Sequence, residues 1–263
     1  MDTNTKARIE ELISNMLERI IIRRTLTEPF DEIIIEKNNP FGYRLIPIEI
    51  WKGAKFERSF VTSLGQSVFE QVAKIIAQGT GAIAENQHDE FVTINTWRKE
   101  KIDELLSLHR GNKKAPNWEL EVTEILNLNN NKYEDLKVKF DLYIKRKDST
   151  EEFYSLKTVK PNLDQTEIAK RDMLYMKACK VNSEVFFALP FNPAGEGGIY
   201  KSIHSIPYKI FDMDNDECVL IGSGFWNKVG QDENTYSELL EIFSKVGLKY
   251  TNIIRNDYLG LNE

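Results

Sequence analysis

The chain has 263 residues, of which 41% are hydrophobic and 29% are charged. These proportions are those of an ordinary globular protein, and the length is sufficient for one large domain with a buried core. The sequence has no apolar run of about 18 residues and begins with charged residues, so we expect neither a membrane span nor a signal peptide. Cys179 and Cys218 lack the spacing of metal ligands, which favours a reduced, cytoplasmic location.

The net charge of −6 argues at first against a nucleic-acid partner. The charge is unevenly distributed, however, because residues 132–180 contain twelve Lys or Arg and nine Asp or Glu, which makes this window +3 and the remainder −9. A locally basic region on an acidic protein suits a phosphate polyanion that is handled together with metal ions. Solvated faces of strands and helices would give the same count.

The first third of the chain is predicted to be mainly helical. Apolar residues at helical spacing predict an amphipathic helix over Thr5–Arg24. Residues 25–58 are mixed, with a short strand-like stretch at Ile33–Ile35. A second helix is expected over Phe60–Gln78, and it ends at the glycines of Gly79–Gly81.

The middle of the chain begins with a short strand over Phe91–Asn95 and a helix over Trp97–His109. A short helix is then expected to begin at Asn117. Two neighbouring strands are predicted within residues 134–159, because the charged segment between them, residues 145–152, is too short for a helix. This pattern indicates a β-hairpin.

Polar side chains of the hairpin fall on one face. In Leu136–Ile144 apolar and polar residues alternate, which places Asp141 on the polar face. Ser155 and Lys157 are two residues apart and therefore share a face of the next strand. With a turn centred near Ser149, Asp141 lies opposite Lys157. A carboxylate and an ammonium placed in this way can bind a divalent metal and act on a phosphate.

The last part of the chain alternates helices and strands. Asp164 as N-cap and Glu167 three residues later predict a capping box for a helix that ends at Lys180. The later elements are a buried central strand over Val185–Leu189, a loop over 190–206, a strand over Cys218–Ile221 and a helix over Tyr236–Val246. We therefore predict an α/β fold with a central mixed β-sheet flanked by helices. We expect a single domain over residues 1–263 with an N-terminal helical segment over about residues 1–55.

The hairpin residues resemble a known motif. Asp141 followed by Ser155-Leu-Lys157 resembles the hairpin of the PD-(D/E)xK nucleases, and the string Ser155–Asn162 is similar to the active-site segment of the TdeIII-like type II restriction endonucleases. The segments Ser59–Glu70 and Gly224–Gln231 are also similar to that family and occur in the same order. The likeness covers roughly residues 55 to 250.

This resemblance implies a restriction-endonuclease-like core and a Mg²⁺-dependent site. Asp141 would bind the metal, and Lys157 would orient the attacking water and stabilise charge on the phosphoryl oxygens. One departure from the family pattern is Ser155, which stands where an acidic residue is expected. A hydroxyl carries no charge and is a weak Mg²⁺ ligand, so another residue has to supply the acid.

Three acidic residues are candidates for this relocated acid. Glu70 lies on the helix before the sheet, on a polar or small face (Ser63, Gln66, Glu70, Ala73, Lys74 and Ala77). Asp164 and Glu167 lie at the start of the helix after the hairpin, where capping explains them equally well. We rank Glu70 first, as a catalytic and metal-binding residue, then Glu167 as a metal ligand. Ser155, Lys160 and Asp164 are expected elsewhere in the active site.

The function implied is sequence-specific hydrolysis of double-stranded DNA in a restriction-modification system, by a cytoplasmic homodimer. The family suggests a short GC-rich palindrome such as GGNCC. Loops that are equally well explained as plain connections are candidate DNA contacts: Lys113, Lys114, Asn117, Asn192 and His204. The alternatives are a DNA-binding protein of the same fold that has lost cleavage because of Ser155, and an α/β protein unrelated to nucleic acid.

Overall fold

The computed structural model describes residues 1–261. Contacts divide the chain into two compact units. One comprises residues 73–236 together with Met1, and the other comprises residues 2–72 with the segment from residue 237 onward. The expected single domain stays a prediction, and each unit is described by itself.

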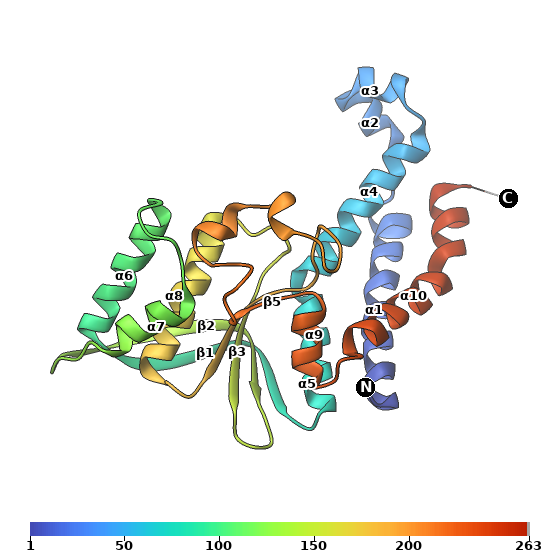
Figure 1. The fold of residues 1–263 in the computed structure, drawn as a ribbon. Helices are drawn as coiled ribbons and strands as arrows, with labels where there is room; N and C mark the ends of the chain where they lie inside the picture. Colours follow the sequence, from blue (N-terminus) through green and yellow to red (C-terminus); the bar gives the residue numbers. More distant parts are fainter. Residues whose placement is uncertain (262–263) are drawn as a thin grey trace. The chain divides into compact units, whose positions relative to one another are not determined.

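The first unit contains a five-stranded mixed sheet, as predicted (Figure 1). The strands follow one another across the sheet in chain order: β1 (Ile83–Asn95), β2 (Tyr133–Lys145), β3 (Glu151–Leu156), β4 (Glu184–Leu189) and β5 (Val219–Ile221). The first three strands are antiparallel, whereas β3, β4 and β5 run parallel. The predicted strand at Phe91–Asn95 is the end of the longer β1.

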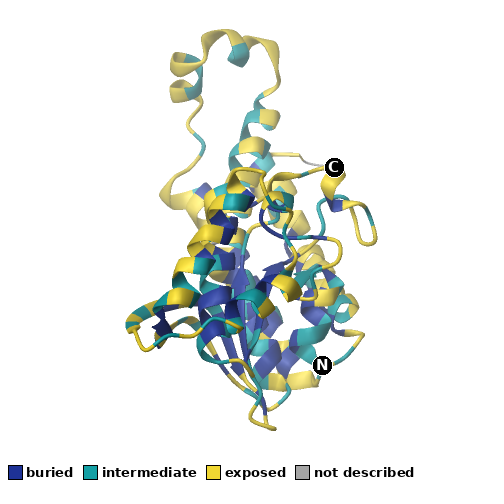
Figure 2. Cartoon of the chain, turned by 60° about the vertical axis from the view of Figure 1, so that its left-hand side comes forward, coloured by how far each residue is buried: buried dark blue, intermediate teal, exposed yellow. Residues whose placement is uncertain are grey.

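Helices α6 (Thr96–Arg110), α7 (Trp118–Leu126) and α8 (Leu163–Cys179) cover one face of this sheet (Figure 1). Their apolar residues form one core with the sheet; its members include Ile102, Leu105, Phe140, Phe153, Met173 and Phe187. Figure 2 shows that buried residues are concentrated on the strands and on the helices packed against them. On the other face, α9 (Ser223–Gly230) places Phe225 edge-on against Tyr154 with ring centroids 5.8 Å apart.

The prediction of a buried central strand is confirmed in β4, which lies between β3 and β5. Val185 to Leu189 are all buried. A parallel strand that is covered on both faces needs apolar residues at every position, and this is why its sequence does not alternate.

The second unit is helical in its described part. Its elements are α1 (Thr3–Ile22), a π-helical turn (Arg23–Thr27), α2 (Glu32–Asn38), α3 (Pro40–Leu45), α4 (Ile48–Ser63), a π-helical turn (Leu64–Val68), the start of α5 (Phe69–Gly79), α10 (Thr235–Asn252) and a π-helical segment (Ile253–Leu259). In the first unit, short 3₁₀ turns at Tyr200–Ser202 and Ile206–Lys209 interrupt the loop before β5. Among the described residues, no helix is both long and apolar enough to cross a membrane.

Two local predictions are wrong. Ile33–Ile35 lies in α2 and is not a strand, because the Asp31 side chain accepts a hydrogen bond from the Ile34 N–H and caps a helix. The helix predicted from Phe60 begins earlier, at Ile48, and a π-helical turn divides it. Ala73 and Ala77, the small residues of the predicted polar or small face, are buried.

The N-cap of α8 also differs from the prediction. Asn162, and not Asp164, caps the helix, and its side chain and that of Gln165 form the reciprocal capping box. The cause is that the chain becomes helical two residues earlier than the Asp–Glu spacing suggested. Asp164 and Glu167 are therefore available for other contacts.

Candidate functional site

Asp141 and Lys157 form an ion pair at the hairpin. Lys157 Nζ lies 2.8 Å from Asp141 Oδ2. Their side chains are 18% and 23% exposed, so a ligand can reach a pair that is still partly shielded from water. Such partial shielding strengthens electrostatic interactions relative to those in bulk water.

The pair forms through a different register from the one predicted. Leu142 pairs with Tyr154 and Ile144 with Glu152, so the hairpin is centred at residue 148 and not at Ser149. Continued by one residue, this register sets Asp141 across from Ser155. Lys157 is therefore the diagonal neighbour of Asp141, which a long side chain can reach.

Ser155 supplies no charge to the site. It is 2% exposed and pairs with Phe187 of the parallel strand β4. A buried hydroxyl in the middle of the sheet is not a substitute for a carboxylate, so the chemistry of the site depends on an acid from another element.

The structure brings Asp172 of α8 close to this pair, a residue that the sequence analysis missed. The backbone N–H of Lys139 on β2 hydrogen-bonds its carboxyl group, which also interacts electrostatically with Lys157 and Asp141. Burial raises the pKa of Asp172 to about 6, and the Asp141 charge contributes to this rise, whereas the Lys139 hydrogen bond and Lys157 oppose it. Asp172 is thus a partly buried carboxyl group within electrostatic range of the Asp141 carboxylate and the Lys157 ammonium.

A weak signal for Asp172 is present in the sequence. Ala169 and Met176, which lie three residues before it and four residues after it, are buried against the sheet. An acidic residue on the apolar side of a helix is costly unless it has a partner or a function. Testing each acid of the helix against its apolar stripe would have selected Asp172.

Asp164 and Glu167 are engaged elsewhere. Arg110, from α6, donates to both carboxylates, at 2.8 Å and 2.7 Å respectively. Glu167 also accepts a hydrogen bond from Arg171 at 2.7 Å. Their predicted roles at the metal stay predictions.

Glu70 lies in the first turn of α5, within the helical unit, whereas Asp141 belongs to the unit with the sheet. Its role at the metal therefore stays a prediction. Lys160 is exposed in the segment that follows Lys157.

The candidate DNA contacts lie in loops, most of them with local structural roles. Lys113 is exposed, and Lys114 pairs with Glu124 at 2.7 Å. The Asn117 side chain caps α7, that of Asn192 bonds within its own loop, and a His204 ring nitrogen lies 2.8 Å from the Pro161 carbonyl oxygen. These contacts shape the loops, and contact with DNA stays a prediction for all five residues.

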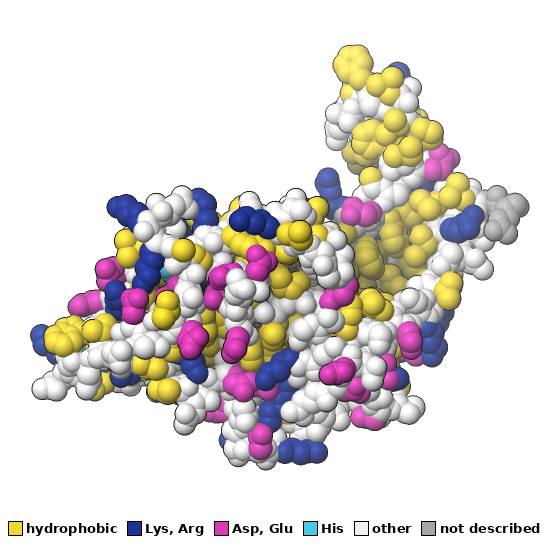
Figure 3. Space-filling view, in the orientation of Figure 1, with side chains coloured by type: hydrophobic (Ala, Val, Ile, Leu, Met, Phe, Trp, Pro, Cys, Tyr) yellow, Lys and Arg dark blue, Asp and Glu magenta, His cyan; other side chains and the backbone are white. Residues whose placement is uncertain are grey.

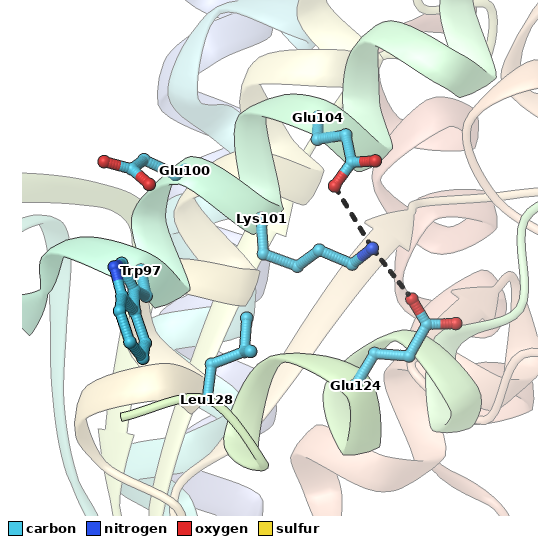
Figure 4. A pocket seen from close by; sticks show the side chains of 6 residues that line it. All are labelled: Trp97, Glu100, Lys101, Glu104, Glu124 and Leu128. Atoms are coloured by element: carbon cyan, nitrogen blue, oxygen red, sulfur yellow. Dashed lines mark hydrogen bonds and ion pairs between the residues drawn. The ribbon is translucent and has the colours of Figure 1, made fainter. Parts of the chain in front are cut away.

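A separate pocket of about 490 Å³ has the wrong charge for DNA phosphate (Figure 4). Its charged lining residues are Glu100, Lys101, Glu104 and Glu124. Lys101 lies between two of these carboxylates, at 3.2 Å and 3.4 Å (Figure 4). Three glutamates and one lysine repel a polyanion, which leaves the hairpin as the candidate for phosphate chemistry.

The hairpin site suits a hard divalent cation that is also coordinated by substrate phosphate. Among residues 1–261, no group of three or more His, Cys, Asp or Glu side chains is arranged to hold a metal by itself. Mg²⁺ is commonly held by one or two carboxylates together with substrate phosphates and water. Asp141 offers one such carboxylate, and that of Asp172 is within electrostatic range of it. On the face shown in Figure 3, basic and acidic side chains are interspersed over the sheet-containing unit.

Comparison with known proteins shows the family to which the chain belongs. Residues 5–247 match the family described as type II restriction endonuclease, HinfI. The chain belongs to this family.

Named relatives support the assignment. Type II restriction enzyme HgiCII of Herpetosiphon aurantiacus is 34% identical over 227 residues, which cover 84% of this chain and 81% of the relative. HgiBI from the same organism is 36% identical, with coverage of 80% and 77%. MjaII of Methanocaldococcus jannaschii is 26% identical, with coverage of 89% and 71%. The predicted class, a type II restriction endonuclease, is thus confirmed at the level of the family.

Proposed function

We propose that this protein is a Mg²⁺-dependent endonuclease that hydrolyses phosphodiesters of double-stranded DNA. The observation that carries the proposal is the ion pair between Asp141 and Lys157, formed beside the carboxyl group of Asp172. Two acidic side chains and one ammonium supply the charges that a phosphoryl-transfer site requires.

Asp141 and Asp172 would hold the metal. Both present hard oxygen donors, and their mutual repulsion favours a cation between them. When bound, Mg²⁺ would neutralise phosphate charge and make water a better nucleophile. Asp172 takes the place that the motif gives to the acid at position 155.

Lys157 would act on the substrate. In the free protein its ammonium is held by Asp141 Oδ2, and its backbone N–H donates to the Ala188 carbonyl at 2.9 Å. This anchoring fixes the base of the side chain on the central part of the sheet. The ammonium can then orient the attacking water and stabilise negative charge on the phosphoryl oxygens.

The finer assignment follows the resemblance to TdeIII-like enzymes of the PD-(D/E)xK superfamily. It gives 5′-phosphate and 3′-hydroxyl ends and a short GC-rich palindrome such as GGNCC. Cutting both strands of a palindrome calls for two sites related by a two-fold axis, so we propose a homodimer. A cytoplasmic restriction-modification system is the setting that this activity serves.

The test is digestion of a mixed-sequence plasmid, with Mg²⁺ or Ca²⁺, followed by sequencing of the ends. We expect discrete fragments with Mg²⁺ and a single recognition sequence at all ends. Duplex binding in Ca²⁺ without any cleavage in Mg²⁺ would favour the alternative that Ser155 has cost the protein its activity. Failure to bind any duplex at low salt would contradict both functions.

A further inference from the structure

Gln87 of β1 has an irregular backbone where this strand passes Asp141. Asn86 pairs with Leu142 and His88 with Phe140, so Gln87 lies across from Asp141. Its φ angle is +54°, in the left-handed region. This region is unfavourable for residues other than glycine, asparagine and aspartate, and it is rare within a strand.

The unusual backbone directs the Gln87 side chain to the candidate site. Its Nε2 donates to Asp141 Oδ1 at 3.4 Å, whereas Lys157 contacts Oδ2 of the same carboxylate at 2.8 Å. Two elements on opposite sides of β2 therefore hold the two oxygens of one carboxylate. The contact from Gln87 is longer and therefore weaker than that from Lys157, so its contribution is to orient the Asp141 carboxylate.

The next residue braces this conformation. His88 Nδ1 lies 3.1 Å from Glu85 Oε2, and its Nε2 lies 3.0 Å from Glu90 Oε2. The ring also stacks on Tyr143 of β2, with centroids 4.4 Å apart. Strained residues persist where their surroundings determine the conformation, and such positions cluster at functional sites.

We propose that Gln87 is a positioning residue that sets the orientation of the Asp141 carboxylate for metal binding. The inference rests on the proposed function, because it assigns Asp141 to the metal. With Oδ1 directed by Gln87 and Oδ2 by Lys157, the carboxylate is preorganised before the cation and DNA arrive. A carboxylate that rotates freely would lose orientational freedom on binding and would bind the cation more weakly.

Two substitutions separate the amide group from the backbone strain. Gln87→Met keeps the length and the strain but removes the amide, whereas Gln87→Gly removes both. Ser149→Gly is the matched control, because Ser149 also has a left-handed φ of +73° and lies exposed in the hairpin turn. All three variants and the parent are compared by thermal unfolding, by plasmid cleavage across a Mg²⁺ series, and by Mn²⁺ binding followed by EPR without DNA.

Both Gln87 variants should bind Mn²⁺ several-fold more weakly and need several-fold more Mg²⁺ for half-maximal cleavage. Their duplex affinity in Ca²⁺ should change less than twofold. Gln87→Gly should unfold at the same temperature as the parent or a higher one, and Ser149→Gly should match the parent in metal binding and cleavage.

Parental Mn²⁺ affinity in Gln87→Met would overturn the proposal. Weakened binding in Gln87→Met together with parental binding in Gln87→Gly would also overturn it, because the amide is absent from both variants and full affinity would then not depend on it. These failures leave parental cleavage intact. Failure of the proposed function instead appears as a parent protein that does not cleave in Mg²⁺.

Discussion

Helix α8 contributes one residue to each of two groups of charged side chains, and the two groups differ in how completely their charges are compensated. Lys170 is fully buried with Glu121, 2.6 Å away, and His109, whose Nε2 lies 2.9 Å from the Glu121 carboxylate. Asp172, only two residues after Lys170, is within electrostatic range of Asp141 and Lys157, whose side chains are still partly exposed. The same helix thus supports a closed charge cluster and an open one.

The Glu121 cluster and Asp172 differ in whether neighbouring groups compensate the buried carboxylate charge. Burial alone would raise the pKa of Glu121, but the hydrogen bond with His109 and the charge of Lys170 outweigh it, so this pKa is lowered. The Lys170 ammonium also donates to the Ile210 carbonyl at 2.6 Å and lies over the Phe211 ring. Asp172, in contrast, has a raised pKa. A buried cluster whose charges are compensated by close ion pairs is structural, whereas an accessible group whose charge is incompletely compensated is a candidate for binding and catalysis.

The largest expected effect is on cleavage by Asp141→Asn. Removing one carboxylate charge from the metal site should lower the cleavage rate about a thousandfold or more, because metal assistance supplies several kcal/mol of transition-state stabilisation. Duplex binding in Ca²⁺ should fall much less. The measurement is single-turnover plasmid cleavage, and a rate within about tenfold of the parent, a loss of only about 1.4 kcal/mol, would remove Asp141 from the site.

The closed cluster should respond through stability. Glu121→Ala leaves the Lys170 ammonium buried without its counter-charge and removes the partner of His109, so the free energy of unfolding should fall by about 3–5 kcal/mol. Glu124→Ala, on the same helix but at a half-exposed pair with Lys114, is the control and should cost about 1 kcal/mol or less. Denaturant unfolding measures both variants, and equal losses would show that burial does not separate the two pairs.

Asp172→Asn should stabilise the folded protein, whereas Glu121→Ala should destabilise it. Because the folded-state pKa is about 6 and the ordinary value is 3.8, the folded state favours the protonated form. Stability from this group is present at low pH and is lost as the pH rises through 6. The uncharged variant should therefore be about 1–3 kcal/mol more stable than the parent at pH 8.

This gain should shrink towards zero at pH 4, where the parent carries a protonated Asp172. Denaturant unfolding of both proteins at the two pH values gives the comparison. A variant that is less stable than the parent at pH 8 would mean that Asp172 is compensated in the same way as Glu121.

The smallest effect is expected for a loop lysine. If Lys113 contacts a DNA phosphate, Lys113→Ala should weaken duplex binding several-fold and reduce the slope of log affinity against log salt by about 1. Lys245→Ala, on exposed α10, should leave the slope unchanged. Equal slopes for both variants would place Lys113 outside the DNA interface.

Periodicity was sufficient to predict the hairpin and the buried strand β4, but only the end of β1. The apolar run in β4 and the alternation around Asp141 are local signals, and the strands follow them. The register could not be obtained in this way, because the hairpin centre depends on the conformation of the turn, where Ser149 adopts a left-handed φ. α2 was missed because its consecutive β-branched residues favour a strand, whereas its helical structure is stabilised by caps.

The site was predictable only in part. Asp141 and Lys157 lie in one hairpin, so alternation alone places them on neighbouring strands. Asp172 and Gln87 reach the site from other elements, α8 and β1. The apolar stripe of α8 marks Asp172 as lying on the buried side of the helix, but no local pattern shows which strand it or Gln87 meets. Long-range packing decides these positions.

The most direct test of the account is the rate at which Asp172→Asn cleaves supercoiled plasmid in Mg²⁺ at pH 8. The account predicts a rate at least about a hundredfold below the parent, a loss of about 2.7 kcal/mol of transition-state stabilisation, in a variant that is no less stable. Cleavage within about tenfold of the parent would contradict the assignment of Asp172 as the acid that replaces the motif residue at position 155.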